Sequence, residues 1–254
     1  MHLQLPGARI AYEDTGGHGV PVLFLHAGTG STPMWAFQVR AFSEAGYRCI
    51  AYDRRGHGRT EASEAGAAAA DDLQGLVDAL AIDRFHLVGT AAGGIVAIDY
   101  ALSFPQRLRS LVIANSIGGV QDEDYLDLQR RLRPAPQFAA LPPEVRELGP
   151  SYRAANPDGT RQWIELEQAS RPGGQASPPT ARNRITFASL EAIEVPTLLL
   201  TGDGDLYAPP PVLQLFRKRI KNSEAVVIPE CGHSAYWEQP GLFNKAVLDF
   251  LAKN

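Results

Sequence analysis

Residues 87–94 (Leu-Val-Gly-Thr-Ala-Ala-Gly-Gly) constrain the fold of this chain more than any other stretch. They join an apolar run at 84–88, which fits a buried strand, to a run at 95–102 that fits a helix. The connection has the spacing Gly-x-Ala-x-Gly, centred on Ala91. Glycines two positions before and after the centre are needed where a Cβ would collide across a tight turn. The stretch therefore predicts a strand, a strained turn and a helix.

The rest of the pattern predicts an α/β protein with a mostly parallel sheet. Five further short apolar runs fit buried strands, at 20–25, 48–52, 108–115, 197–201 and 225–228. Helix-like segments separate several of them, and unbroken apolar strands alternating with helices are typical of parallel pairing buried on both faces. Residues 3–5 and 9–12, separated by a Pro-Gly turn, predict an antiparallel hairpin at the edge of the sheet.

The composition changes after Ser116. Residues 117–190 contain polar helical segments, expected at 122–133, 143–155 and 160–169, and no apolar strand of the earlier kind. Helices inserted between two sheet strands are expected to cover the carboxyl ends of the strands, where open α/β sheets bind ligands. We therefore expect a core of residues 1–116 and 191–254, with a helical cap at 117–190.

Composition narrows the kind of partner. The 254 residues include 24 basic and 28 acidic side chains, with a net charge of −4 and no long run of either sign, which argues against nucleic acid. No run reaches the roughly 20 apolar residues that span a bilayer. The N-terminus lacks the basic start and apolar run of a secretory signal. Two cysteines are too few for a disulfide framework, so we expect a cytoplasmic protein acting on a small molecule.

The stretch at 87–94 resembles the nucleophile elbow of the α/β-hydrolase fold, which normally reads Gly-x-Ser-x-Gly. The resemblance implies a central sheet of about eight strands, mostly parallel, with helices on both faces and an inserted helical cap. The nucleophile position is Ala91, which lacks the hydroxyl of serine. Two interpretations stay open: an inactive variant of a serine hydrolase that traps its substrate, or a natural member that works without that oxygen.

The same resemblance implies a histidine and an acid. Gly-Asp-Gly-Asp at 202–205 is similar to the turn that carries the acid, which places it at Asp205, with Asp203 as the alternative. Gly-His at 232–233 is similar to the turn that carries the base, His233. In such a site the histidine moves the proton, and the acid fixes its tautomer.

The loop at 25–30 resembles the family's oxyanion loop, with alanine in place of its first glycine. The resemblance implies oxyanion donors at the backbone amides of Gly28 and Ala92, with Thr29 as the alternative to Gly28. Trp163 and Trp237 are candidates for contact with the substrate. The loop continues without the Lys-Ser/Thr of a phosphate-binding loop, and we expect neither a cofactor nor a metal.

These residues favour a hydrolase of a small carboxylic ester or lactone. Hydrolases that cleave carbon–carbon bonds of ring-fission products typically carry a tryptophan after the histidine, whereas this chain has Ser234. Two alternatives remain: a protein that binds a small ligand without turnover, and a cofactor-free lyase or water-activating enzyme with His233 as its base. No motif names the substrate or separates a monomer from a homodimer.

Overall fold

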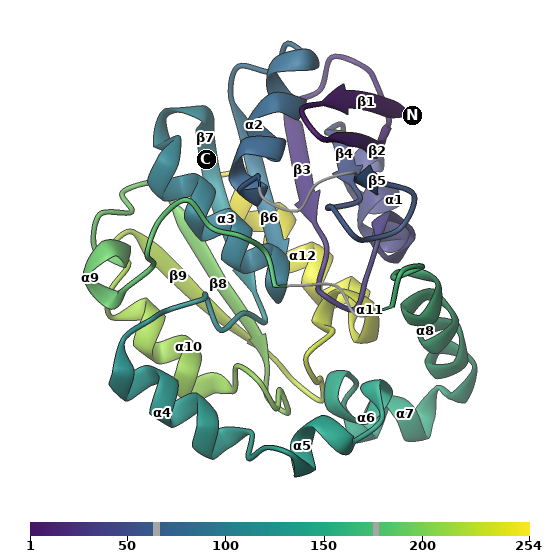
Figure 1. Ribbon diagram of the computed structural model, residues 1–254, viewed down its shortest axis with the longest axis vertical. Helices are drawn as coiled ribbons and strands as arrows, with labels where there is room; N and C mark the ends of the chain where they lie inside the picture. The colour runs from purple at the N-terminus through teal and green to yellow at the C-terminus, as the bar shows by residue number, and fades with distance from the viewer. Residues whose placement is uncertain (63–66, 175–177) are drawn as a thin grey trace.

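A nine-stranded sheet forms the centre of the computed structural model, which describes residues 1–62, 67–174 and 178–254 (Figure 1). The strands are β1 (His2–Leu5), β2 (Ala8–Asp14), β3 (Pro21–Leu25), β4 (Arg48–Tyr52), β5 (Glu61–Ala62), β6 (Phe85–Thr90), β7 (Leu108–Ala114), β8 (Thr197–Gly202) and β9 (Ser223–Ile228). Their order is β1-β2-β4-β3-β6-β7-β8-β9, and the two-residue β5 pairs with β2. The mostly parallel sheet is confirmed, with nine strands where about eight were expected; the short β5 was not anticipated.

Strand direction follows the sequence pattern. β1 and β2 form the antiparallel hairpin, and β2 also pairs antiparallel with β4. The short β5 pairs antiparallel with β2, whereas the pairs along the order β4-β3-β6-β7-β8-β9 are parallel. Alternate residues of β3 enter different cores, with Leu23 and Leu25 in one and Val22 and Phe24 in the other. Both faces of the strand are therefore buried, which explains its unbroken apolar sequence.

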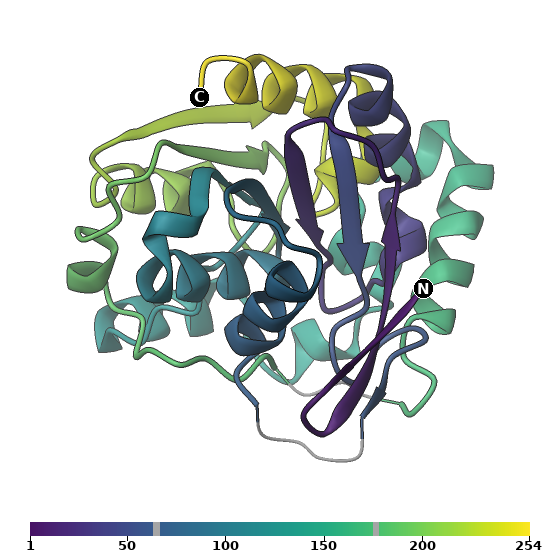
Figure 2. The same cartoon turned by 90° about the horizontal axis from the view of Figure 1, so that it is seen from above.

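Helices cover both faces of the sheet. Those of the core are α1 (Ala36–Glu44), α2 (Ala69–Ala79), α3 (Ala92–Ser103), α10 (Pro210–Arg217), α11 (Ala235–Glu238) and α12 (Pro240–Leu251), with the 3₁₀ helices η1 (Thr32–Trp35) and η2 (Pro105–Arg107). Figure 1 shows α2 and α3 in front of the sheet and α12 behind it, and Figure 2 shows the same layers from above. In the described ranges, no helix is long and apolar enough to cross a membrane.

In the described part of the segment expected to form the cap, six helices lie between β7 and β8. They are α4 (Glu123–Leu132), α5 (Gln137–Ala140), α6 (Pro143–Glu147), α7 (Pro150–Ala155), α8 (Pro157–Ala169) and α9 (Phe187–Leu190). In Figure 1, α4 to α7 form a row below the sheet. The end of the segment returns to the core, because the backbone amides of Arg182 and Asn183 donate to Asp99 of α3. Residues 175–177 of this segment lie outside the described residues.

Capping sets one boundary that periodicity missed. The helix expected from residue 160 begins at Pro157, because the Asn156 side chain accepts a hydrogen bond from the Gly159 amide at 2.9 Å. Proline at the first helical position has no amide hydrogen to leave unpaired. The helical segment expected at 143–155 is broken instead, with Leu148 and Gly149 between α6 and α7.

Candidate active site

The turn between β6 and α3 has the predicted strained backbone. Ala91 has φ 51° and ψ −113°, a conformation that a residue with a Cβ rarely adopts. A Cβ added at Gly89 would collide with the carbonyl of Gly93, and one added at Gly93 with the carbonyl of Leu25. Both glycines are therefore required by close backbone packing, and the side chain at position 91 is held at the tip of the turn.

Hydrogen bonds hold this turn against the next strand. The Ala91 amide donates to the Ala114 carbonyl at 2.9 Å, and the Ser116 hydroxyl donates to the Ala91 carbonyl at 2.6 Å. Neither bond involves the side chain at position 91. The turn therefore keeps its conformation without a serine hydroxyl.

His233 and Asp205 form a buried pair at the carboxyl ends of the strands. His233 Nδ1 lies 2.8 Å and 2.9 Å from the two carboxylate oxygens of Asp205. The alternative acid, Asp203, instead accepts a hydrogen bond from the Cys231 amide at 3.1 Å. The geometry therefore brings Asp205, and not Asp203, to the imidazole.

The Asp205 carboxylate is fixed by four further donors. Oδ1 accepts from the backbone amides of Tyr207 and Ala208, at 2.7 Å and 3.0 Å. Oδ2 accepts from the Asn115 amide nitrogen at 3.0 Å and from the Thr201 hydroxyl at 3.1 Å. Because all of these groups donate, the ionised carboxylate is favoured and its orientation toward the ring is set.

The charges of Asp205 and His233 move their pKa values in opposite directions. Burial pushes the pKa of Asp205 upward, but the charge of His233 and the hydrogen bonds outweigh it and lower that pKa to about 2. Burial lowers the pKa of His233, whereas the carboxylates of Asp205 and Glu147 raise it, and the net pKa is raised. The pair therefore suits an imidazole that accepts a proton and is then stabilised as a cation.

A cavity of about 190 Å³ lies over the turn. It is lined by Gly28, Thr29, Ala91, Ala92, Ile95, Ile117, Arg133, Glu147, Tyr207 and His233. Five predicted site residues thus share one cavity, and Asp205 stands behind the imidazole. Within the described chain, no group of three or more His, Cys, Asp or Glu side chains is arranged to hold a metal ion.

The backbone amides of Gly28, Thr29 and Ala92 lie at this cavity. None of these amides donates a hydrogen bond to another residue of the part of the chain that the structure describes. Amides aimed at one hollow can stabilise a negative oxygen that develops there. These amides are therefore free to donate to a ligand in the cavity, and their role as oxyanion donors stays a prediction.

The loop that carries Gly28 is braced from behind. His26 Nδ1 lies 2.7 Å from the Ala27 carbonyl, and its Nε2 accepts from the Arg54 amide at 3.0 Å. The Arg54 guanidinium donates to the Ala27 carbonyl at 3.1 Å. Because these bonds occupy both ring nitrogens, His26 positions the loop and has no free nitrogen for proton transfer.

The two tryptophans predicted to contact the substrate do not line the cavity. Trp163 of α8 is fully buried in the core cluster that contains Leu148. Trp237 is also buried, and its ring lies 5.4 Å from that of Phe37. Both rings pack into the core instead, because Trp163 lies on the covered face of the amphipathic α8 and Trp237 lies in α11, whose four residues are all buried.

Glu147 lies in the cavity and was not predicted. Its Oε2 lies 4.0 Å from His233 Nε2 and, in the described part of the chain, has no hydrogen-bond partner. Burial raises its pKa, against the charge of His233. No local pattern distinguishes Glu147 from the other charged residues of the insertion, so only packing identifies it.

Tyr207 was missed for a similar reason. Its ring centroid lies 4.3 Å from that of His233, with the planes tilted by 33°. The residue follows the acid turn by two positions, and its amide bonds Asp205. The aromatic face therefore covers one side of the imidazole and limits its movement.

Glu238 connects the insertion to the histidine loop. Its carboxylate accepts from the amides of Gly149 at 2.7 Å, Gly232 at 3.0 Å and Ser234 at 3.1 Å. The Glu147 carbonyl accepts from the His233 amide at 2.8 Å. These bonds explain why the helix expected at 143–155 is interrupted, and they fix Glu147 against the imidazole.

Comparisons with known proteins agree with the fold. A family model described as the alpha/beta hydrolase fold matches residues 20–240. RutD of Variovorax paradoxus, a protein named as a carbamate hydrolase, is 33% identical over 92% of each chain. A 2-hydroxy-6-oxononadienedioate/2-hydroxy-6-oxononatrienedioate hydrolase of Burkholderia vietnamiensis is 30% identical over 96% of this chain and 91% of its own.

A solved structure extends the agreement to three dimensions. The malate-bound thermophilic esterase from Thermogutta terrifontis superposes with a TM-score of 0.83 at 29% identity, over 97% of this chain and 94% of the esterase. The family model covers most of the chain. The chain therefore belongs to the α/β-hydrolase fold family, like these three relatives, which are named as two hydrolases and an esterase.

Proposed function

We propose that this chain is a hydrolase of small carboxylic esters or lactones whose nucleophile position is held by Ala91, so that it binds substrate and turns it over slowly. The observation that carries the proposal is the single cavity shared by Ala91, His233 and the free amides of Gly28 and Ala92. A carbonyl carbon above the Ala91 methyl group would place its oxygen toward those amides.

Each group has a chemical task. With serine at position 91, His233 Nε2 would take the hydroxyl proton as the oxygen attacks the acyl carbon, and would return it to the leaving group. Asp205 would hold the Nδ1–H tautomer and stabilise the imidazolium. Without that oxygen, binding and oxyanion stabilisation remain, and loss of a triad member typically leaves about 10³–10⁴-fold acceleration over water.

Names of relatives support acyl chemistry in this cavity. The Thermogutta protein is an esterase, and RutD is named for the hydrolysis of a carbamate. Both reactions begin with attack on an acyl carbon that bears an oxygen or nitrogen leaving group. We assign residues 117–190 the role of a cap, because Arg133 and Glu147 of this segment contribute to the cavity wall.

The surroundings of the protein are part of the same proposal. Cys49 and Cys231 are buried as free thiols, which fits a reducing compartment such as the cytoplasm. A cavity of about 190 Å³ suits a small-molecule substrate. The proposed reaction involves neither nucleic acid nor a membrane surface.

The test is Ala91→Ser. We expect this variant to hydrolyse p-nitrophenyl acetate and butyrate or a small lactone, and to be labelled by a fluorophosphonate. Ala91→Ser combined with His233→Ala is the matched control and should lose both. Silence of Ala91→Ser in both assays, across a panel of esters and lactones, would contradict the proposal.

A second candidate rests on Glu147. Its unpartnered Oε2, 4.0 Å from His233 Nε2, leaves room for the two groups to act on one water molecule without any serine. The chain as it stands would then hydrolyse an ester by direct attack of that water, and Glu147→Gln would abolish this turnover. Saturable ligand binding with no turnover, unchanged by Ala91→Ser, would instead identify a binding protein.

A further inference from the structure

A second cavity, of about 450 Å³, lies beside the catalytic one. Its wall includes Gln129, Arg130, Arg133, Phe138, Arg146 and Tyr207. Arg133 and Tyr207 also line the cavity above Ala91. A ligand held at the turn can therefore extend past these two side chains into the outer hollow.

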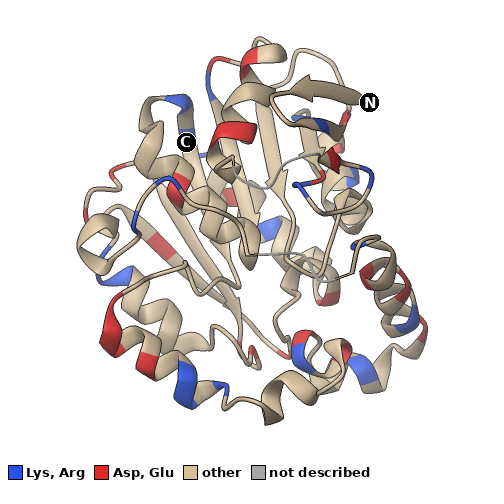
Figure 3. Ribbon diagram, in the orientation of Figure 1, with Lys and Arg blue, Asp and Glu red and all other residues tan. Residues whose placement is uncertain are grey.

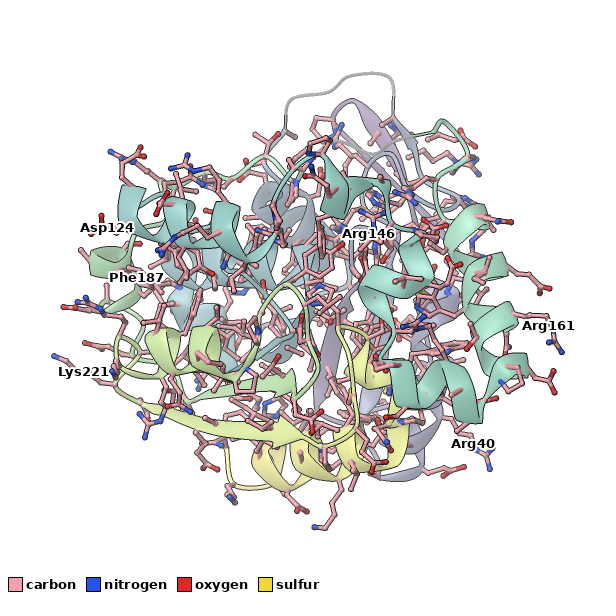
Figure 4. All side chains as sticks on the ribbon, turned by 90° about the horizontal axis from the view of Figure 1, so that it is seen from below. Arg40, Asp124, Arg146, Arg161, Phe187 and Lys221 are labelled. Atoms are coloured by element: carbon pink, nitrogen blue, oxygen red, sulfur yellow. The ribbon has the colours of Figure 1, made fainter. Side chains whose placement is uncertain are left out.

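Positive charge gathers at this hollow. Arg130 lies on α4, Arg133 directly follows it and Arg146 lies on α6, and Figure 3 shows blue segments on both helices. In Figure 4, Arg146 lies near the middle of the face seen from below, whereas Arg161 lies at its margin. In the described part of the chain, none of the three lining arginines forms an ion pair.

The guanidinium groups are held but not neutralised. Arg133 donates to the Gln129 side chain at 2.6 Å, and its guanidinium lies 5.2 Å from the centre of the Tyr207 ring. The Nε atoms of Arg133 and Arg146 are buried without a hydrogen-bond partner in the described chain. By contrast, the neighbouring Arg131 pairs with Asp127 at 3.1 Å. The buried Nε atoms are out of reach of a ligand, but no carboxylate of the described chain pairs with either guanidinium, so the unneutralised charge favours an anion in the hollow.

The residues that line the hollow limit the class of anion that fits it. Its wall also contains the ring of Phe138, which packs edge-on against Tyr207 at 5.1 Å between centroids. Apolar walls beside two planar guanidinium groups fit a hydrocarbon chain that ends in a carboxylate. The two carboxylates beside the catalytic cavity, Glu147 and Asp205, face His233.

We propose that the outer hollow binds a carboxylate group of the substrate between Arg133 and Arg146. The substrate is then a half-ester of a dicarboxylic acid, or a lactone bearing a free carboxylate. Its scissile carbonyl lies over Ala91 while its charged end lies in the hollow. This assignment rests on the proposed function for the position of the carbonyl, but the carboxylate site itself can be measured without turnover.

The binding test uses the chain with Ala91 in place. Monomethyl glutarate and dimethyl glutarate differ only in one carboxylate, and we expect calorimetry at low salt to show about ten- to hundredfold tighter binding of the half-ester. In Arg133→Gln and Arg146→Gln this preference should fall toward one. Arg131→Gln is the matched control and should keep the preference, because Arg131 lies on α4 two positions before Arg133 but pairs with Asp127.

A conservative variant and a competing anion test the proposal further, in case a glutamine variant is unstable or another anion binds in the hollow. Arg146→Lys keeps the positive charge but loses the forked pair of guanidinium donors, so it should retain part of the preference for the half-ester. Inorganic phosphate should displace the half-ester less well than glutarate does. Equal affinity for the two methyl esters, or stronger displacement by phosphate, would overturn the proposal.

Turnover separates this inference from the proposed function. In Ala91→Ser, the mono-p-nitrophenyl ester of glutaric acid should be cleaved with a higher kcat/KM than its neutral methyl ester. Equal cleavage of both would overturn the carboxylate site and leave the hydrolase intact. Arginine-dependent binding of the half-ester without cleavage of any ester would support the site and contradict the hydrolase.

Discussion

Replacement of Ala91 by glycine tests whether the turn stores strain. Ala91 has φ 51° and ψ −113°, where a Cβ is disfavoured and glycine is not. Strained positions of this kind cost of order 1–3 kcal/mol. Glycine also makes the unfolded chain more flexible, which lowers the free energy of unfolding by about 0.5–1 kcal/mol and offsets part of the gain. We therefore expect Ala91→Gly to raise the free energy of unfolding by about 1 kcal/mol.

The assay is equilibrium unfolding in urea together with a thermal melt. For a chain of this length, about 1 kcal/mol corresponds to a rise in Tm of about 2–4 °C. Ala81 provides an independent check, because it is exposed and also has positive φ, 52°, after α2. Ala81→Gly should also stabilise, since glycine is favoured at the end of a helix.

The control is an alanine with ordinary backbone angles. Ala79 is exposed in the last turn of α2, where glycine should lower the free energy of unfolding by up to about 1 kcal/mol. If Ala91→Gly destabilised the protein as much as Ala79→Gly, while Ala81→Gly stabilised it, the turn at Ala91 would hold no strain and the reasoning would fail.

Three further predictions concern the groups around His233. Glu147→Gln in Ala91→Ser should move the acidic limb of the kcat–pH profile to lower pH, because it removes a carboxylate that raises the His233 pKa, while Asp205, Arg133 and Tyr207 remain; an unmoved limb would contradict this. Asp205→Asn in Ala91→Ser should lower kcat for p-nitrophenyl butyrate by about 10⁴; a loss below tenfold would show that the carboxylate does not set the tautomer. Glu238→Ala should lower the free energy of unfolding by about 2–4 kcal/mol in urea, since three amides lose a charged acceptor, and Glu238→Gln should cost less; equal stability of all three proteins would contradict the clamp.

Local signals in the sequence predicted much of the fold. The glycines around Ala91 specify the turn because backbone atoms approach them closely, and that constraint is visible in the spacing alone. The strand β3 was predicted because burial on both faces requires an unbroken apolar run. His233 and Asp205 follow strands whose carboxyl ends meet at one edge of the sheet.

Long-range packing determined the parts that were missed. Glu147 reaches the imidazole because Glu238, 91 positions later, interrupts the helix beside it, and no local pattern records that contact. The sequence around Trp163 predicts an amphipathic helix, but it does not show whether the apolar face of that helix lies against a ligand or, as observed, against the core. The sequence specifies which residues are apolar, whereas the surface that covers them depends on the assembled fold.

The structure also explains why one oxygen is a sufficient test of the proposed reaction. The turn is held by the Ala91 backbone through Ala114 and Ser116, and the imidazole by Asp205, so no bond of the site uses the side chain at position 91. Ala91→Ser should therefore add a nucleophile to a site that is already arranged, and a crystal structure of this variant should superpose on the present chain. Movement of the His233 loop in that structure would show that the geometry depends on the nucleophile, and would remove the basis for reading the alanine site as a hydrolase.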